Sequence, residues 1–179
     1  AAPANTNLYV WGLDLSGSLQ GAGGIGGLLT VRKRLEDGTG VVRNYDYLFD
    51  ANGNVVQEIL RTDGAINAHY EYDPFGNTVV ALRVDAADNP FRFSTKWFDN
   101  DTGLGYWGYR WYNPGMGRWM SRDPVGDVFF LQSRTFDMIP EERNEFIAYA
   151  VLPALALPYR SVDNDAIAAI DPLGDILLK

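Results

Sequence analysis

Aromatic residues alternate with small or polar residues along residues 70–126, and Gly, Pro, Asn and Asp interrupt the alternation repeatedly. A period of two is typical of strands that bury one face, and closely spaced turn residues favour antiparallel hairpins. Four of the five tryptophans lie in this stretch. We therefore expect residues 70–126 to form short, tightly turned antiparallel strands around which the rest of the chain is organised.

Two sequence units repeat before and within this stretch. Residues 45–54 read YDYLFDANGN and residues 70–77 read YEYDPFGN, so that the two D-x-x-G-N turns are offset by 23 residues. Asn-Gly and Asp-Pro-x-Gly are both strong turn sequences, and strands over 55–60 and 78–84 complete two hairpins. A repeat of this length indicates stacked supersecondary units. Side chains at i and i+2 of a strand share a face, which predicts a stacked ladder of Tyr45, Tyr47, Tyr70 and Tyr72.

A glycine-rich run, GAGGIGG, occupies residues 21–27. It lacks the Lys-Ser/Thr that a nucleotide-binding loop requires, and residues 28–31 (LLTV) read as a strand rather than a helix. We interpret the run as a sharp bend or a close backbone approach between strands.

The tract Asn89–Gly126 carries an ordered set of motifs: NPFRFS, a D-x-x-TGL turn, G-Y-R-x-Y-x-P, GRWMS and DPVG. It resembles the signature of RHS-repeat (YD-repeat) proteins, the RHS-repeat-associated core domain. The resemblance implies hairpins that wind into a β-spiral able to close into a hollow shell. The expected fold is therefore mostly β: tandem antiparallel hairpins of a β-spiral or shell fragment, followed by a less regular C-terminal part.

Three regions follow from these motifs. Residues 1–88 hold the glycine-rich segment and the YD-type hairpins, residues 89–126 the core signature, and residues 127–179 a divergent segment with a second DPxG. Residues 127–143 read as an insertion relative to the family pattern. Pro140 and the acidic residues after it predict the start of a short helix.

Composition narrows the function classes. A formal charge of −8 and a pI of about 4.5 argue against a nucleic-acid partner, since an acidic chain repels phosphates. The absence of cysteine excludes thiolate chemistry and disulfides. No apolar run approaches the ~18 residues of a membrane span. No motif implies a cofactor, and a secreted or cell-surface location is expected from the family resemblance.

Asp123 and Asp171, the aspartates of the two DPxG motifs, are the candidate catalytic residues. By the family resemblance they form an aspartyl autoprotease that cleaves its own chain near Gly174, with Arg118 as the nearby cation. Two close carboxylates share a proton, so that one acts as acid and the other as base. The alternative is that Asp-Pro-x-Gly simply forms a good turn. The motifs stand 48 residues apart, about twice the family spacing, and Asp follows each glycine.

Two further stretches could form a binding site or have a purely structural role. Asp99 and Asp101 begin a stretch like half of a calcium loop, but Arg110 stands where a bidentate Glu belongs, so a plain hairpin turn is favoured. The aromatic residues between 97 and 119 could offer a carbohydrate platform, yet packing between strands is the more common use of such rings. Arginines interleaved with them are expected to stack on rings: Arg92, Arg110 and Arg118.

Three functions stay open at this stage. The chain is a structural or encapsulating module of an RHS-type shell, an autoprotease of the same family, or an extracellular subunit that self-assembles through hairpin edges. Unpaired strand edges are templates for further strands. The expected partners are accordingly the rest of its own shell or further copies of itself.

Overall fold

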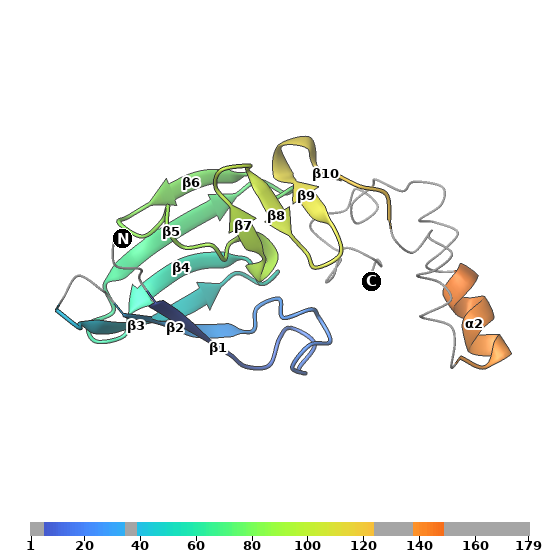
Figure 1. Cartoon of the computed structure of the whole chain (residues 1–179), viewed down its shortest axis with the longest axis horizontal. Helices are drawn as coiled ribbons and strands as arrows, with labels where there is room; N and C mark the ends of the chain where they lie inside the picture. The colour runs from blue at the N-terminus through green and yellow to red at the C-terminus, as the bar shows by residue number, and fades with distance from the viewer. Residues whose placement is uncertain (1–5, 35–38, 124–137, 149–179) are drawn as a thin grey trace. The chain divides into compact units, whose positions relative to one another are not determined.

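Six strands form one antiparallel sheet in which each strand pairs with the next strand in the sequence (Figure 1). This order, β1-β2-β3-β4-β5-β6, confirms the predicted mostly β fold of tandem hairpins. The predicted strand 78–84 ends two residues early, because Arg83 adopts a left-handed backbone with φ of 87°. The strands are β1 (Thr6–Trp11), β2 (Leu28–Arg34), β3 (Val42–Phe49), β4 (Val55–Leu60), β5 (Ile66–Tyr72) and β6 (Thr78–Leu82).

The computed structural model describes residues 6–34, 39–123 and 138–148. The chain divides into two compact units, residues 1–73 with 77–100 and residues 74–76 with 101–179. The six-stranded sheet lies in the first unit, which also contains the 3-10 turn η1 (Phe93–Thr95) and the short strand β7 (Trp97–Asp99). The three sequence regions, bounded at residues 88 and 126, stay a prediction.

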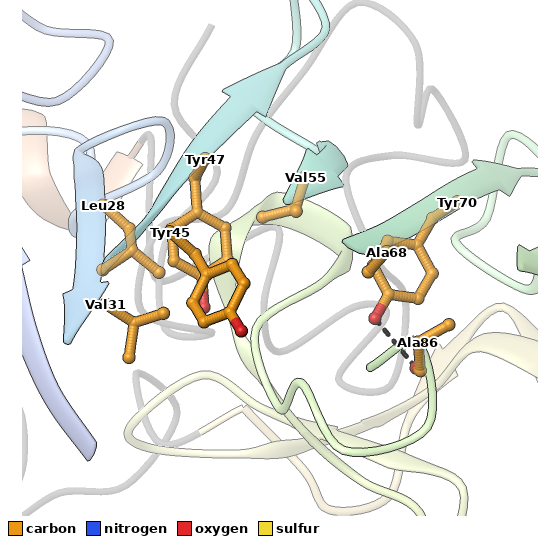
Figure 2. Close-up of a cluster of buried hydrophobic side chains, with 8 residues drawn as sticks. All are labelled: Leu28, Val31, Tyr45, Tyr47, Val55, Ala68, Tyr70 and Ala86. Carbon is orange, nitrogen blue, oxygen red and sulfur yellow. Dashed lines mark hydrogen bonds between the residues drawn. The ribbon is translucent and has the colours of Figure 1, made fainter. Parts of the chain in front are cut away.

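One face of the six-stranded sheet carries the core of the first unit. Its buried side chains come from β2, β3, β4 and β5 and from the segment after β6 (Figure 2). Register explains the shared face, because Val31 lies opposite Tyr45 and Glu58 lies opposite both Tyr47 and Ala68. The cluster consists of Leu28, Val31, Tyr45, Tyr47, Val55, Ala68, Tyr70 and Ala86.

The repeated tyrosines occupy the covered face of the sheet, as the alternation predicts. Tyr45, Tyr47 and Tyr70 are buried, and Tyr72 packs against the same cluster. Stacking runs along β5, where the rings of Tyr70 and Tyr72 lie 6.2 Å apart at 23°. The hydroxyl of Tyr70 donates to the carbonyl of Ala86 at 2.8 Å, a bond drawn in Figure 2. Burial raises the pKa of Tyr47 and Tyr72 well above the usual value, so these hydroxyls stay neutral.

The two D-x-x-G-N turns are built alike. In the first, the Asp50 carboxylate accepts from the Asn54 backbone N–H at 2.9 Å and from the Asn54 side-chain amide at 2.8 Å. In the second, Asp73 accepts from the same two groups of Asn77 at 2.9 and 2.8 Å. The Asp-to-Asn spacing of four residues therefore specifies the turn locally, which is why sequence alone predicts both hairpins.

The glycine-rich loop between β1 and β2 closes around a buried carboxylate. Asp14 accepts from the backbone N–H groups of Ala22 at 2.8 Å and Gly24 at 3.1 Å, and from the Ser16 hydroxyl at 2.6 Å. Burial opposes ionisation of Asp14, but these hydrogen bonds prevail and hold its pKa below the usual value. The stability that this carboxylate contributes is thus present above its unfolded pKa and is lost as pH falls through the folded pKa.

The second unit contains three strands of a second sheet, in the order β10-β9-β8. Asn113 caps the 3-10 turn η2 (Pro114–Met116) by accepting from the Met116 N–H at 3.1 Å, and Gly117, with φ of 60°, ends it. The turn leads directly into β10, so β9 and β10 form a tight hairpin. The strands are β8 (Leu104–Tyr106), β9 (Trp111–Asn113) and β10 (Arg118–Trp119).

The predicted helix is present as α2 (Pro140–Phe146). Pro140 occupies its first turn together with Glu141 and Glu142. Acidic side chains in this turn interact favourably with the positive end of the helix dipole. In the parts of the chain that the structure describes, no helix has the length and apolar character needed to cross a membrane.

Gly53 is a position at which the fold demands glycine. Its φ is 73°, and a Cβ there would lie 2.5 Å from Cγ2 of the buried Ile25. Gly53→Ala should therefore lower the free energy of unfolding by about 3 kcal/mol, because left-handed strain costs roughly 1–2 kcal/mol and crowding roughly 1–3 kcal/mol.

Gly64→Ala is the matched control for urea unfolding of Gly53→Ala. Gly64 has φ of 74°, but a Cβ there would meet nothing within 4 Å. It should cost only the strain, about 1 kcal/mol. Equal losses for the two variants would contradict the close approach of the glycine-rich loop to the first hairpin turn.

Candidate functional site

The signature segment, residues 89–96, is anchored first by Asn89, which is 1% exposed. Its side-chain oxygen accepts from the Tyr47 hydroxyl at 3.0 Å and from the Phe91 N–H at 3.2 Å. Its side-chain nitrogen donates to the Phe91 carbonyl at 2.9 Å. Only an amide supplies donor and acceptor together, so Asn89 both folds its own loop and ties it to β3.

Arg92 provides the second anchor of the signature segment. It is buried, and its guanidinium donates to the carbonyl oxygens of Asn89 at 3.2 Å and Ala86 at 2.9 Å. The same group lies over the rings of Tyr70 and Phe98, with 5.3 and 4.8 Å to the centroids. Carbonyl dipoles and ring faces thus solvate a charge that burial removes from water.

Thr95 provides the third anchor. Its hydroxyl donates to the Gly53 carbonyl at 2.7 Å and accepts from the Gly26 N–H at 2.8 Å, so it joins the first hairpin turn to the glycine-rich loop. The Ser94 N–H donates to the Asn54 side chain at 2.7 Å. Ser94 and Thr95 have φ of 51° and 53°, an unfavourable conformation for side chains with a Cβ. The signature therefore functions as a structural clamp of the first unit.

An ionic cluster lies on the covered face of the same sheet. Nζ of Lys33, on β2, is 2.7 Å from Oε1 of Glu58, on β4, and 2.7 Å from Oδ2 of Asp85, after β6. Asn67, on β5, donates its amide to both carboxylates. Lys33 reaches over the ring of Tyr45, 4.6 Å from its centroid.

The cluster is charged but poorly hydrated. The Glu58 side chain is 0% exposed, and its Oε2 has no hydrogen-bond partner among the described residues. Burial lowers the pKa of Lys33, but the neighbouring Glu58 and Asp85 carboxylates outweigh it and raise that pKa above its usual value. The stability that this ammonium contributes is present below its unfolded pKa and is lost as pH rises through the folded pKa.

In the second unit, Asp123 is held by a buried arginine. Nη2 of Arg110 lies 2.9 Å from Oδ2 of Asp123, and the side chains are 1% and 11% exposed. The Arg110 guanidinium stacks 4.2 Å from the Trp119 ring centroid. Trp119 in turn contacts Trp107 and Tyr112 edge-on, at 5.5 and 5.1 Å. An aromatic cluster thus shields the ion pair from water and strengthens it.

The predicted catalytic residues are only partly placed. Asp123 lies at the end of the described core of the second unit, and Asp171 falls outside the described residues. Arg118 is exposed on β10, whereas the buried cation that contacts Asp123 is Arg110. The sequence predicts that Arg110 stacks on a ring but does not predict its contact with Asp123, because no local pattern relates these two positions.

The other candidate residues fall into two groups. Trp107, Tyr112 and Trp119 are buried, while Trp97, Tyr106, Tyr109 and Trp111 keep 39–51% of their surface exposed. Arg92 and Arg110 lie over rings as expected. Asp99 ends β7 and Asp101 lies in the following turn; within the described residues, no three His, Cys, Asp or Glu side chains converge on a metal position.

Comparisons with known proteins support the family resemblance. No family model matches the chain. It is 37% identical over 90 residues to "Toxin subunit YenC1" of Yersinia entomophaga, covering 48% of this chain and 8% of that protein. It is 34% identical over 83 residues to "tRNA nuclease WapA" of Bacillus subtilis, and 36% identical over 73 residues to "Double-stranded DNA deaminase toxin A" of Burkholderia cenocepacia. Those matches cover 46% and 39% of this chain and 4% and 5% of the relatives.

A solved structure matches more of the chain. The crystal structure of TcdB2-TccC3-Cdc42 superposes with a TM-score of 0.60 at 26% identity, covering 82% of this chain and 6% of that one. Together with the relatives above, it confirms the predicted resemblance to RHS-repeat proteins. The chain spans less than a tenth of the length of these relatives.

Replacing Arg110 should lower the free energy of unfolding much more than replacing Arg118. Arg110→Met leaves the buried Asp123 carboxylate without its cation, which costs about 3–5 kcal/mol of unfolding free energy. Arg118→Met alters an exposed side chain and should change stability by no more than about 0.5 kcal/mol. Urea unfolding followed by tryptophan fluorescence measures both, and comparable losses would refute the assignment of Arg110 as the partner of Asp123.

Proposed function

We propose that this chain is a wall segment of a larger RHS-type shell, a scaffold that encloses another part of the same protein or of its assembly. The observation that carries the proposal is the six-stranded sheet itself. It is an open meander whose strands and hairpins are held together by buried charges and by the signature segment. Its contacts serve architecture, which is what a wall requires.

The relatives support a shared scaffold. Their printed names describe a toxin subunit, a tRNA nuclease and a DNA deaminase toxin, and each match covers only 4–8% of the relative. A segment common to proteins with such different names is better suited to a shared structural task than to any one of those chemistries. The toxin names also favour a secreted or surface-exposed location for this chain.

The outer strands of the sheet support continuation into further strands. Among the described residues, β1 and β6 have strand partners on one side only. Both carry exposed apolar side chains: Leu8 is 59% and Leu82 is 56% exposed. Unpaired apolar edges attract another strand. The partner is the rest of the shell or, as the alternative, further copies of this chain.

The chain contains no cysteine, so single cysteines report edge pairing cleanly. A wall continues in one direction, which pairs the β6 edge of one segment with a β1 edge of the next, whereas a two-fold dimer pairs like edges. When Leu8→Cys and Leu82→Cys chains of different tag length are mixed and oxidised, the mixed disulfide should predominate. Leu48→Cys, 43% exposed but on the internal strand β3, is the control and should stay uncrosslinked.

Other outcomes of this experiment separate the alternatives. Disulfides between two copies of the same variant would replace the wall by a symmetric self-assembling subunit. Monomers alone, by sedimentation and by gel, would remove both edge-pairing functions.

Autoproteolysis is the second candidate function, and the Arg110–Asp123 pair favours it. An aspartyl pair works when one carboxylate stays ionised and the other holds a proton. The Arg110 guanidinium, 2.9 Å away, favours the ionised form of Asp123 and would leave Asp171 as the acid. By the family resemblance, cleavage would follow near Gly174.

Intact mass of the chain with a C-terminal reporter tests this second function. Wild type should end near Gly174, while Asp123→Asn and Asp171→Asn should stay whole. Asp163→Asn, which alters an aspartate outside both DPxG motifs, is the control and should be cut like wild type. A wild-type chain that retains its reporter would assign both DPxG motifs to turns.

A further inference from the structure

The ionic cluster of the first unit has the composition of a self-reacting site. A primary amine, Lys33 Nζ, lies at hydrogen-bond distance from two carboxylates, Asp85 and Glu58. We propose that Lys33 and Asp85 condense into an intramolecular amide cross-link, with Glu58 transferring the protons. This inference goes beyond the scaffold function and does not depend on it.

Each group has a distinct place in the reaction. Lys33 Nζ is the nucleophile, and its 2.7 Å contact with Asp85 Oδ2 brings it next to the carboxyl carbon. Glu58 Oε1 lies 2.7 Å from the same nitrogen, within reach of its protons. Asn67 donates its amide to Asp85 Oδ2, where it would stabilise the negative charge that develops as the amine adds.

The condensation balances without any outside reagent. The resting cluster holds an ammonium and two carboxylates. A proton moves from Lys33 through Glu58 to Asp85, which gives an amine and a carboxylic acid. The amine adds to the acid carbon, and its second proton passes through Glu58 to the departing oxygen. The products are one amide and one water molecule, with Glu58 again ionised.

Burial and proximity drive the step. A fully buried Glu58 whose Oε2 has no partner among the described residues has a vacant position for a proton in transit. The two carboxylates raise the pKa of Lys33 and hold it as an ammonium at rest. Desolvation acts in the opposite direction and lowers the free-energy cost of reaching the neutral amine–acid pair, because low polarity penalises charge. Groups held in contact react with effective concentrations of about 10⁵–10⁸ M, which favours condensation over hydrolysis.

The surrounding side chains fit this chemistry. Tyr9 and Tyr47 are two of the nearby phenols, and burial raises the pKa of both, so they add no negative charge. The ring of Tyr45 covers the Lys33 ammonium. The Asp85 side chain, 20% exposed, leaves a route for the released water. The bond would tie β2 to the segment after β6, across residues 52 apart.

Intact mass of the full chain decides the proposal. Wild type should be lighter than its sequence by one water molecule, and a tryptic map should show the peptides of Lys33 and Asp85 joined. Lys33→Met should have the full mass of its sequence. Glu58→Gln should condense about 10²–10⁴-fold more slowly, the usual effect of losing a general acid–base. Lys96→Met, which alters a lysine that donates to the Gly23 carbonyl, should still lose water.

The wild-type measurement is decisive even if a variant fails to fold. A full-mass wild type would overturn the proposal and leave the cluster as an ion pair. Loss of ammonia in place of water would move the bond to the Asn67 amide and overturn the assignment of Asp85. Cleavage near Gly174 changes only the C-terminal peptide and is therefore distinguishable from the internal cross-link.

Discussion

The first unit depends on the hydroxyl of Thr95. It bridges the carbonyl of Gly53 and the N–H of Gly26, two backbone groups that come from different loops and face each other only because both positions are glycine. Thr95 and Ser94 accept a left-handed backbone to reach this position. Strain of this kind persists only where the surroundings over-determine it, and here Arg92 and Asn89 provide the additional constraints through their own backbone contacts.

Each unit places a buried arginine over an aromatic ring, but the two arginines are neutralised differently. Arg92 is solvated by carbonyl oxygens and rings, and no carboxylate among the described residues forms an ion pair with it. Arg110 has a carboxylate, Asp123, and a tryptophan face. Arg92 thus holds backbone carbonyl groups in place, whereas Arg110 holds the side chain of Asp123 in place. An arginine is suited to both roles because its planar guanidinium donates in the ring plane while its face stacks.

Short sequence patterns predicted the hairpins. The features that could not be predicted from the sequence depend on contacts between residues far apart in the chain. The Asp50–Asn54 and Asp73–Asn77 turns are complete within five residues, so their geometry could be read directly. The tyrosine face followed from alternation alone. By contrast, the sequence predicts the stacking of Arg110 on a ring, which the structure shows, but not its ion pair with Asp123. That contact depends on which side chains of a short hairpin are buried, and this in turn depends on what packs over them. Lys33 and Glu58 carried a usable signal: charged residues at positions whose alternation points toward the core.

A meander of neighbouring strands has a mechanical weakness that the ionic cluster addresses. Ladder hydrogen bonds join each strand only to the next, so opening at one edge can spread strand by strand. Lys33 on β2 contacts Glu58 on β4 and Asp85 beyond β6, and thereby bypasses the ladder. A contact that skips strands couples β2, β4 and the segment after β6 into one cooperative unit, because separating any of them would leave a buried charge without its partner. The same placement gives a covalent bond at this point its greatest effect, since it closes a long loop of the unfolded chain.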